Sequence, residues 1–153
     1  MKIRNGIVLI VTTLISCVSK IGDAPPHSAL LLTGTWQLIT GTLIEKGDTT
    51  VTDYTKKISF IKIINDAHFA FLQHDLTKGK DSAVFVAGGG PYFLKDSVYT
   101  EHLEYCSARE WEGNDFKFTI IIKNDTLIQT GKEKVESTGV NRLNTERYVR
   151  VKK

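Results

Sequence analysis

Cysteine is nearly absent from the sequence, since only Cys17 and Cys106 occur in 153 residues. Two cysteines exclude a disulfide framework and a four-thiolate zinc site. Proline is rare as well, with three residues, and no Ser-rich or Gln/Asn-rich tract occurs, which argues against a disordered chain. The sequence also has little excess of one charge, because 20 Lys and Arg stand against 17 Asp and Glu. Scattered, balanced charge forms no electrostatic surface for nucleic acid, so no nucleic-acid partner is expected.

The N-terminal segment has the features of a secretory signal. Lys2 and Arg4 give a basic start, and the uncharged run GIVLIVTTLI follows at residues 6–15. This run is shorter than the roughly 20 apolar residues that a bilayer-spanning helix needs. A basic start followed by a short apolar run is typical of a cleaved signal peptide, which we expect at residues 1–16.

The end of this segment resembles the lipobox of bacterial lipoproteins. Leu14-Ile15-Ser16-Cys17 places an aliphatic residue, a tolerant position and a small residue before a cysteine. The resemblance implies that Cys17 is the acylated first residue of the mature chain, in preference to an ordinary signal peptide with an incidental cysteine. A multiply acylated cysteine holds a protein firmly at a membrane. We therefore expect a cell-envelope protein anchored to the outer membrane through Cys17, facing either the periplasm or the surface.

The rest of the chain divides into a tether and one all-β domain. Residues 17–29 contain Pro25-Pro26 and small polar residues, which are typical of a linker. Over residues 30–153, short β-branched and aromatic segments alternate with Gly, Asn and Asp, a pattern that indicates strands and turns. We expect strands at residues 34–44, 57–64, 68–74, 83–87, 92–94, 98–106, 116–123, 126–130 and 145–152.

Alternation and turn residues restrict how these strands assemble. Residues 98–106 and 116–123 alternate apolar and polar side chains, so each strand has one face toward the core and one face exposed to solvent. Asn65-Asp66, Asp96-Ser97 and Asn124-Asp125 suit tight hairpin turns with positive φ. About eight or nine antiparallel strands must close or stack to hide their edges, and a barrel and a sandwich both satisfy this requirement.

Spaced residues favour the barrel. Gly34-Thr35-Trp36 opens the first long strand, and Glu146 to Arg150 closes the last one. This pattern resembles the lipocalin and fatty-acid-binding-protein superfamily, in which an indole at the closed end packs against a basic side chain. The resemblance implies a single antiparallel up-and-down β-barrel of about eight or nine strands. It also implies a contact between Trp36 and either Arg147 or Arg150 at the barrel end.

The chain more closely resembles the lipocalin-like domains of lipoproteins from Bacteroides-type bacteria, over about residues 32–151. The corresponding motifs are His68-Phe69, Gly88-Gly89-Gly90, Tyr99-Thr100-Glu101 with Glu104-Tyr105, and Glu146, Tyr148 and Arg150. Leu127 and Tyr148 stand where Trp is common in that family, which would narrow or reshape a cavity. The function of the family is largely unassigned, so the resemblance implies a fold and a cellular location more than a biochemical function.

Glu101 is the main candidate for a ligand-binding residue. It shares a strand face with Tyr99, Leu103 and Tyr105, and this more apolar face is the expected interior. A carboxylate inside a barrel needs a cation or several hydrogen-bond donors. Glu101 therefore either anchors a ligand together with Tyr99 and Tyr105, with Arg150 as a further ligand-binding candidate, or forms an internal salt bridge to Arg147 or Arg150. The salt bridge is slightly favoured.

Histidines offer weaker candidates. His68 lies in an apolar strand and is either a core or rim residue or a ligand-binding one. His102 and Glu104 share a strand face, but no third ligand stands at a suitable spacing, so we expect no metal and no cofactor. Trp111 lies in a polar loop, where it either meets a partner or folds back over the barrel end.

These observations lead to three functional hypotheses. The first is a lipid-anchored barrel that binds a small apolar or amphipathic ligand, without catalysis. The alternative is a protein–protein interaction or envelope-assembly module with a packed interior. The third, an enzyme that uses Glu101 and His68, is required by no sequence feature. A cavity above about 300 Å³ would favour the ligand, and a filled interior would favour the protein partner.

Overall fold

A computed structural model of the chain describes residues 31–152, which form an antiparallel sheet of ten strands. Two short 3-10 helices are η1 (Arg109–Trp111) and η2 (Glu136–Thr138). The strands, in chain order, are β1 (Gly34–Glu45), β2 (Asp48–Asp53), β3 (Ile58–Ile64), β4 (His68–Asp75), β5 (Phe85–Lys95), β6 (Val98–His102), β7 (Tyr105–Cys106), β8 (Asp115–Lys123), β9 (Thr126–Val135) and β10 (Val140–Arg150). The signal peptide, the lipidation site at Cys17 and the tether, expected at residues 1–29, lie outside the described residues.

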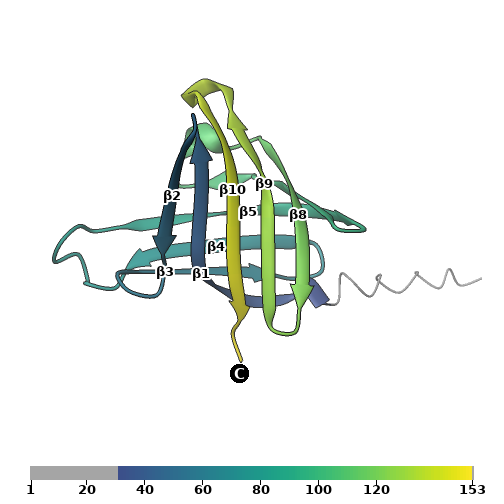
Figure 1. Ribbon diagram of the computed structural model, residues 1–153, viewed down its shortest axis with the longest axis horizontal. Coiled ribbons are helices and arrows are strands. Elements are labelled where there is room, and N and C mark those ends of the chain that lie inside the picture. Colours follow the sequence, from purple (N-terminus) through teal and green to yellow (C-terminus); the bar gives the residue numbers. More distant parts are fainter. Residues whose placement is uncertain (1–30, 153) are drawn as a thin grey trace, which may run out of the picture.

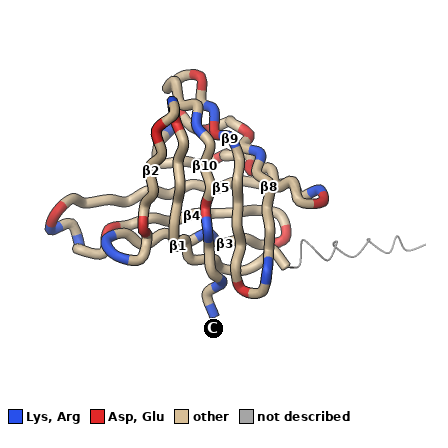
Figure 2. The backbone as a smooth tube through the Cα atoms, in the orientation of Figure 1, with Lys and Arg blue, Asp and Glu red and all other residues tan. Residues whose placement is uncertain are grey.

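The sheet closes into a barrel, as the sequence predicted. Eight strands follow one another in the order β1, β3, β4, β5, β6, β8, β9 and β10, and β10 then pairs with β1 from Trp36↔Arg150 to Ile44↔Leu143. Strand β2 pairs with the second half of β1, and β7 pairs with β5, so both lie beside the closed ring. In Figure 1 strands β1, β8, β9 and β10 cross β3, β4 and β5 at a steep angle. Charged residues gather mainly in the turns and at strand ends (Figure 2).

Most of the expected strands are present, but several of their limits differ. Strand β9 extends to Val135 and β10 already begins at Val140, beyond the expected 126–130 and 145–152. The segments expected at 83–87 and 92–94 form the single strand β5. The strand expected at 98–106 is broken into β6 and β7, and β2 was not expected at all. Strand β2 carries mostly exposed polar residues, so it lacks the apolar alternation by which a strand is recognised.

The glycine run in β5 explains the break between β6 and β7. Gly88-Gly89-Gly90 lies inside β5 as a strand bend and does not form a turn. A Cβ at Gly90 would stand 2.0 Å from the His102 carbonyl oxygen and 2.9 Å from the Glu104 amide nitrogen. The segment from His102 to Glu104 therefore passes so close to β5 that only glycine fits beneath it.

This break reverses the expected orientation of Tyr105. Because the alternation restarts after Glu104, Tyr105 is 64% exposed and Cys106 turns inward, at 8% exposed. The prediction that Tyr105 shares the interior face of Glu101 is wrong. The part of the prediction that concerns Tyr99, Glu101 and Leu103 is confirmed, since all three are buried.

Two of the three expected turns have the predicted backbone. Asp96 and Asn124 adopt positive φ, at 58° and 54°. Asn65 does not, because its side-chain oxygen accepts hydrogen bonds from the amides of Ala67, at 2.9 Å, and His68, at 2.7 Å. Asparagine thus forms this turn through its side chain, a second way in which it stabilises loops.

The closed end of the barrel is packed around Trp36. The indole is inaccessible to solvent and donates to the Leu32 carbonyl at 2.8 Å. The Arg150 guanidinium lies 4.0 Å from the centre of the indole, donates to the Thr33 carbonyl at 2.7 Å and also donates to the Leu31 carbonyl. Gly34, at φ 137°, makes room for this guanidinium. The expected contact between the indole and a basic residue is therefore present and comes from Arg150.

Arg147 does not take part in the closed end. It pairs across the barrel seam with Thr40, and its side chain is exposed. The expectation that Arg147 contacts Trp36 or Glu101 is wrong. Neighbouring residues of a strand point to opposite faces, so Arg147 points outward beside the buried Tyr148. The arginine that reaches the indole is Arg150. Within residues 31–152, no helix is long and apolar enough to cross a membrane.

Candidate functional site

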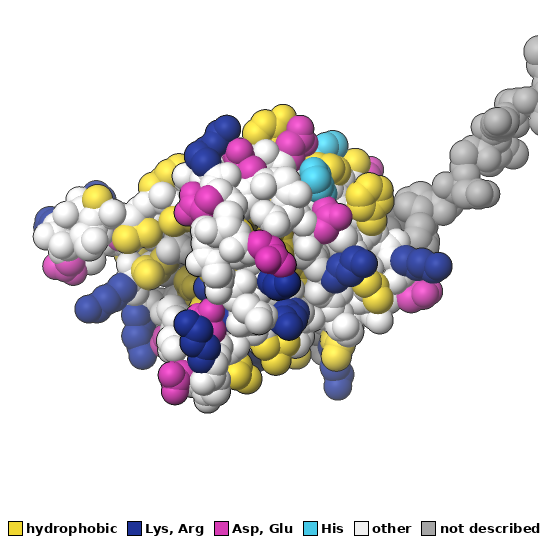
Figure 3. All heavy atoms as spheres, turned by 90° about the horizontal axis from the view of Figure 1, so that it is seen from above, with side chains coloured by type: hydrophobic (Ala, Val, Ile, Leu, Met, Phe, Trp, Pro, Cys, Tyr) yellow, Lys and Arg dark blue, Asp and Glu magenta, His cyan; other side chains and the backbone are white. Residues whose placement is uncertain are grey.

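A cavity of about 350 Å³ occupies the barrel on the side away from Trp36. Its apolar wall includes a set of aromatic side chains, namely Tyr54, Phe60, Phe71, Trp111 and Phe116. Its polar groups include Lys62, Glu133, Arg142, Asn144 and Glu146. Figure 3 looks onto the molecule from above, where hydrophobic side chains and charged side chains of both signs lie side by side. The interior is therefore filled at one end and hollow at the other.

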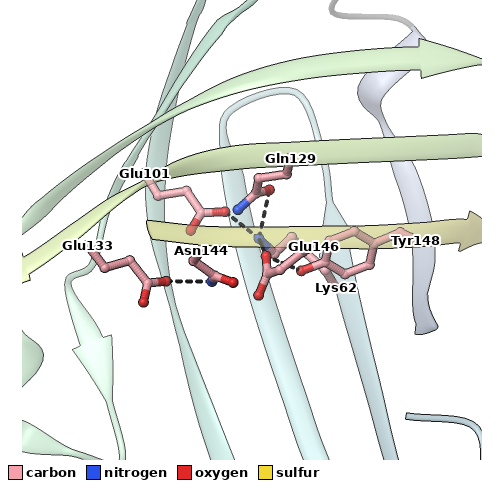
Figure 4. A network of polar contacts seen from close by, with 7 residues as sticks. All are labelled: Lys62, Glu101, Gln129, Glu133, Asn144, Glu146 and Tyr148. Atoms are coloured by element: carbon pink, nitrogen blue, oxygen red, sulfur yellow. Dashed lines mark hydrogen bonds and ion pairs between the residues drawn. The ribbon is translucent and has the colours of Figure 1, made fainter. Parts of the chain in front are cut away.

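Lys62 forms the centre of a polar layer beneath the cavity (Figure 4). Its ammonium group lies 2.6 Å from Glu101 Oε1, donates to Gln129 Oε1 at 3.1 Å and lies 3.9 Å from Glu146 Oε2. Four strands supply this layer, since Lys62 is on β3, Glu101 on β6, Gln129 on β9 and Glu146 on β10. The polar layer thus ties together strands from all around the barrel.

Burial makes the two charges of this layer dependent on each other. The side chains of Lys62 and Glu101 are only 3% and 8% exposed. Burial by itself would lower the pKa of Lys62, but the nearby Glu101 and then Glu146 outweigh it and raise that pKa, so the ammonium keeps its proton. Burial raises the pKa of Glu101, and Lys62 opposes this effect.

Two tyrosines surround the ammonium group of Lys62. The Tyr148 hydroxyl donates to Glu146 Oε2 at 2.7 Å. The Tyr99 hydroxyl is buried and has no hydrogen-bond partner among the described residues, although it lies near enough to Glu101 to lower the pKa of that carboxyl. Burial raises the pKa of both phenols well above its usual value. The rings of Tyr99 and Tyr148 face the ammonium at 5.9 and 5.4 Å from their centres.

A second polar group lies higher in the cavity wall. Arg142 Nε donates to Glu133 Oε2 at 2.6 Å, and Asn144 Nδ2 donates to Glu133 Oε1 at 2.7 Å. The Arg142 guanidinium also lies 5.2 Å from the centre of Trp111. Trp111 in turn packs against Phe116, with ring centres 5.7 Å apart. Trp111 therefore folds back over the barrel end, one of the two placements that the sequence allowed.

The structure separates the residues that the sequence grouped as ligand-binding candidates. Glu101 and Tyr99 are buried below the cavity and are not among the residues that line it. Arg150 lies at the closed end on Trp36, and Tyr105 points outward. The partner expected for Glu101 was an arginine or a tyrosine, and its ion-pair partner is Lys62.

His68 lies apart from the interior. It begins β4 and is exposed, so it does not converge with the buried Glu101. The enzyme hypothesis that joined these two residues has no support in their placement. His102 pairs on the outside with Asp115, with 2.7 Å between Nδ1 and Oδ1. Among the described residues, no group of three or more His, Cys, Asp or Glu side chains is arranged to hold a metal ion.

Cys106 lies in the cavity wall and is the free cysteine of the described residues. Burial raises the pKa of its thiol, and its amide donates to Glu112 Oε1 at 2.8 Å. A raised pKa disfavours the thiolate, which is the nucleophilic form. Cys106 is therefore suited to packing in the wall.

Lys62 is the residue that the sequence analysis missed. Ile61 and Ile63 make one face of its strand apolar, and Phe60 and Ile64 make the other face apolar as well, so the sequence does not show which face points inward. The register resolves the ambiguity, because Lys62 stands directly opposite Trp36 and so shares its inward face. A buried carboxylate at Glu101 that requires a cation was the only indication available in the sequence.

Comparison with known proteins assigns the chain to a family whose function is unknown. A search of the curated proteins found no match to this sequence. A family model matches residues 31–153, which contain the entire barrel together with the cavity and the polar layer. The chain thus belongs to the family described as Domain of unknown function (DUF4488).

Proposed function

We propose that this domain binds a small amphipathic molecule in the cavity of its barrel. The observation that carries the proposal is the cavity of about 350 Å³, with aromatic walls and a polar floor. Ligand sites are concave, mostly apolar and have a few fixed polar groups, and their volumes start near 300 Å³. The ion pairs and hydrogen bonds of the polar layer fix its side chains without a ligand, as in a preformed site.

A variant that fills the cavity tests this proposal. Ala108 is a half-buried residue of the cavity wall, and Ala108→Trp would place an indole in the space. Ala83 is exposed and outside the cavity, so Ala83→Trp is the matched control. We expect an environment-sensitive apolar dye to bind the wild type and the control, and to bind Ala108→Trp at least tenfold more weakly. Equal dye binding by the two variants would refute the cavity as the site.

The same proposal includes a location in the cell envelope. The lipobox-like Leu14-Ile15-Ser16-Cys17 and the similarity to lipocalin-like lipoprotein domains support a lipid anchor on Cys17 at the outer membrane. In a producing bacterium fed a clickable fatty acid, the wild type should carry the label, and Cys17→Ser should remain unprocessed and unlabelled. Cys106→Ser, at the other cysteine, is the control that should keep the label. Undiminished label in Cys17→Ser would rule out the anchor.

A protein-binding function is the second candidate, because one outer face of the barrel exposes large aromatic side chains. Phe85 and Phe93 on β5 are 68% and 69% exposed, and Tyr105 on β7 stands beside β5 opposite Gly89. A photo-crosslinking residue at Phe93 should give a discrete product in the native envelope if a partner covers this face. The same residue at Ile121, which is 60% exposed on β8, is the control. Identical patterns at both positions would argue against a specific partner.

A further inference from the structure

The cavity has a charge and an aromatic lining that select one class of amphiphile. We infer that the ligand carries a cationic head, such as a primary ammonium, and that this head lies against Glu146 and the ring face of Tyr54, Phe60 and Phe71. This inference rests on the proposed ligand-binding function and names its ligand class.

The first argument is the balance of formal charges inside the barrel. Among the described residues, the charged side chains that are buried or line the cavity are Lys62, Glu101, Glu133, Arg142 and Glu146. They comprise three carboxylates and two cations, so the interior has one carboxylate in excess. An uncompensated charge away from water is costly, and a cationic ligand head would supply the missing partner.

The second argument is that Lys62, the cation at the floor of the cavity, is already used. Lys62 has three donor hydrogens and three acceptors within 4 Å, on Glu101, Gln129 and Glu146. Arg142 donates through Nε to Glu133 Oε2 at 2.6 Å and lies over Trp111. The carboxylate of a fatty acid at Lys62 would have to displace one of the three acceptors of the ammonium, and at Arg142 it would stand beside the carboxylate of Glu133; either position opposes binding.

The third argument identifies Glu146 as the carboxylate that remains available. Its Oε2 accepts from Tyr148 and faces Lys62, whereas no hydrogen bond reaches its Oε1 from the described residues. Its side chain lines the cavity and is 15% exposed, so an incoming group can reach it. Figure 4 shows Glu146 at the side of the polar layer, with Lys62 and Tyr148 beside it.

The fourth argument is the aromatic wall next to Glu146. Phe60 stacks on Phe71 with ring centres 5.6 Å apart, and Tyr54 meets Phe60 edge-on at 5.9 Å. Tyr54 packs beside Gly41, where a Cβ would stand 3.1 Å from the Tyr54 ring, and Gly41 is directly opposite Glu146 across the barrel seam. After burial, the Glu146 carboxylate contributes to the raised pKa of the Tyr54 phenol. Lys62 and Arg142 both lie against aromatic faces, while no cation of residues 31–152 covers the ring of Tyr54, Phe60 or Phe71. Aromatic faces beside a carboxylate are the usual recognition chemistry for an alkylammonium.

Matched single-chain probes test the inference. Decylamine, decanol and decanoate share one alkyl chain and differ in the charge of the head, and each is titrated below its micelle concentration against the wild-type domain. We expect decylamine to bind at least tenfold more tightly than decanol, and decanoate to bind most weakly. Equal affinities, or a preference for decanoate, would overturn the cationic head while leaving ligand binding intact. Binding of none of the three probes would instead count against the proposed function itself.

Two variants locate the head group. Glu146→Gln removes the charge with little change in shape, and Tyr54→Leu removes an aromatic face while leaving Glu146 in place. Each should weaken decylamine at least fivefold and leave decanol within twofold, whereas Glu104→Gln, at an exposed carboxylate, should change neither. Circular dichroism and melting curves show whether each variant is folded. Unchanged decylamine binding by folded Glu146→Gln would place the head elsewhere and overturn the inference.

Discussion

Lys62 and Glu101 are each almost inaccessible to solvent, and each is the nearest opposite charge of the other. Replacing such a pair by apolar residues of similar volume is often neutral, whereas removing one partner leaves a buried charge without compensation. The intact pair therefore contributes little net stability, whereas the loss of either partner is expected to cost much more. The burial of Glu101 and its need for a cation followed from the sequence, but the identity of that cation depended on the register of β3 against β1.

Breaking this pair should destabilise the fold strongly. We expect Glu101→Ala to lower the free energy of unfolding by about 3–5 kcal/mol, because Lys62 would lose its closest counter-ion. Glu101→Gln should cost less, since the amide oxygen still accepts a hydrogen bond. The double variant Lys62→Met with Glu101→Leu should recover part of the loss, because the buried ammonium is removed together with its closest counter-ion and only the partly exposed Glu146 then lacks a cation. Urea denaturation of the four proteins measures this, and a double variant less stable than Glu101→Ala would contradict it.

Trp36 should be the most sensitive apolar position of the closed end. Deletion of a large buried aromatic side chain costs about 3–5 kcal/mol, which is the loss expected for Trp36→Ala. Trp36→Phe should cost less, because it keeps a ring beneath Arg150 and loses mainly the hydrogen bond to Leu32. Thermal melting compares the two variants. A Trp36→Ala protein that melts at the wild-type temperature would show that the indole does not carry this packing.

At the scale of single elements, regular strands were predictable and exceptions were not. Strand β8 alternates over its whole length, and its limits follow from that alternation. Strand β2 is polar and exposed, so it follows from its pairing with β1 and from the turn at Lys46-Gly47, where both residues have positive φ. The inversion at Tyr105 depends on the close passage of residues 102–104 over Gly90, a contact between segments distant in the sequence.

Gly90 gives a direct test of this passage. In Gly90→Ala the new methyl group would stand 2.0 Å from the His102 carbonyl oxygen, so β5 and the segment after β6 would have to separate. We expect a loss of about 1–3 kcal/mol or more, the range for overpacking, and a Tyr105 region with faster amide exchange. Gly113→Ala is the control, because a Cβ there meets nothing within 4 Å and only its positive φ is strained. Greater destabilisation by Gly113→Ala than by Gly90→Ala would contradict the tight passage.

For the molecule as a whole, the barrel was predictable and the cavity was not. Closure follows from many short antiparallel strands that must hide their edges, together with the Gly-x-Trp and arginine pair. A cavity depends on the balance between the interior volume and the side chains that fill it, and substitutions at Leu127 and Tyr148 indicated only that its shape would differ from the family. Both residues prove to be fully buried, Tyr148 with its hydroxyl on Glu146. Leu127 and Tyr148 therefore fill the interior below the cavity, and neither side chain lines it.

The pH dependence of global stability should reveal the buried carboxyl. The pKa of Glu101 is raised in the folded protein, chiefly by burial, so above its usual value of 4.5 the native state binds more protons than the unfolded chain. The contribution of Glu101 to stability is then highest near pH 4.5 and falls as pH rises through the pKa of the folded state.

Glu101→Gln lacks the titrating group, so the stability advantage of the wild type over this variant should shrink as pH rises from 4.5. Asp75 acts in the opposite sense in both proteins. Amide hydrogen bonds from Gly79 and Val84 lower its pKa to about 2, so its contribution to stability is lost only as pH falls below about 4. It therefore cancels in the difference between the two. Chemical denaturation of both proteins between pH 4.5 and 8 gives that difference directly, and an advantage that grows with pH would mean that Lys62 outweighs burial and lowers the pKa of Glu101.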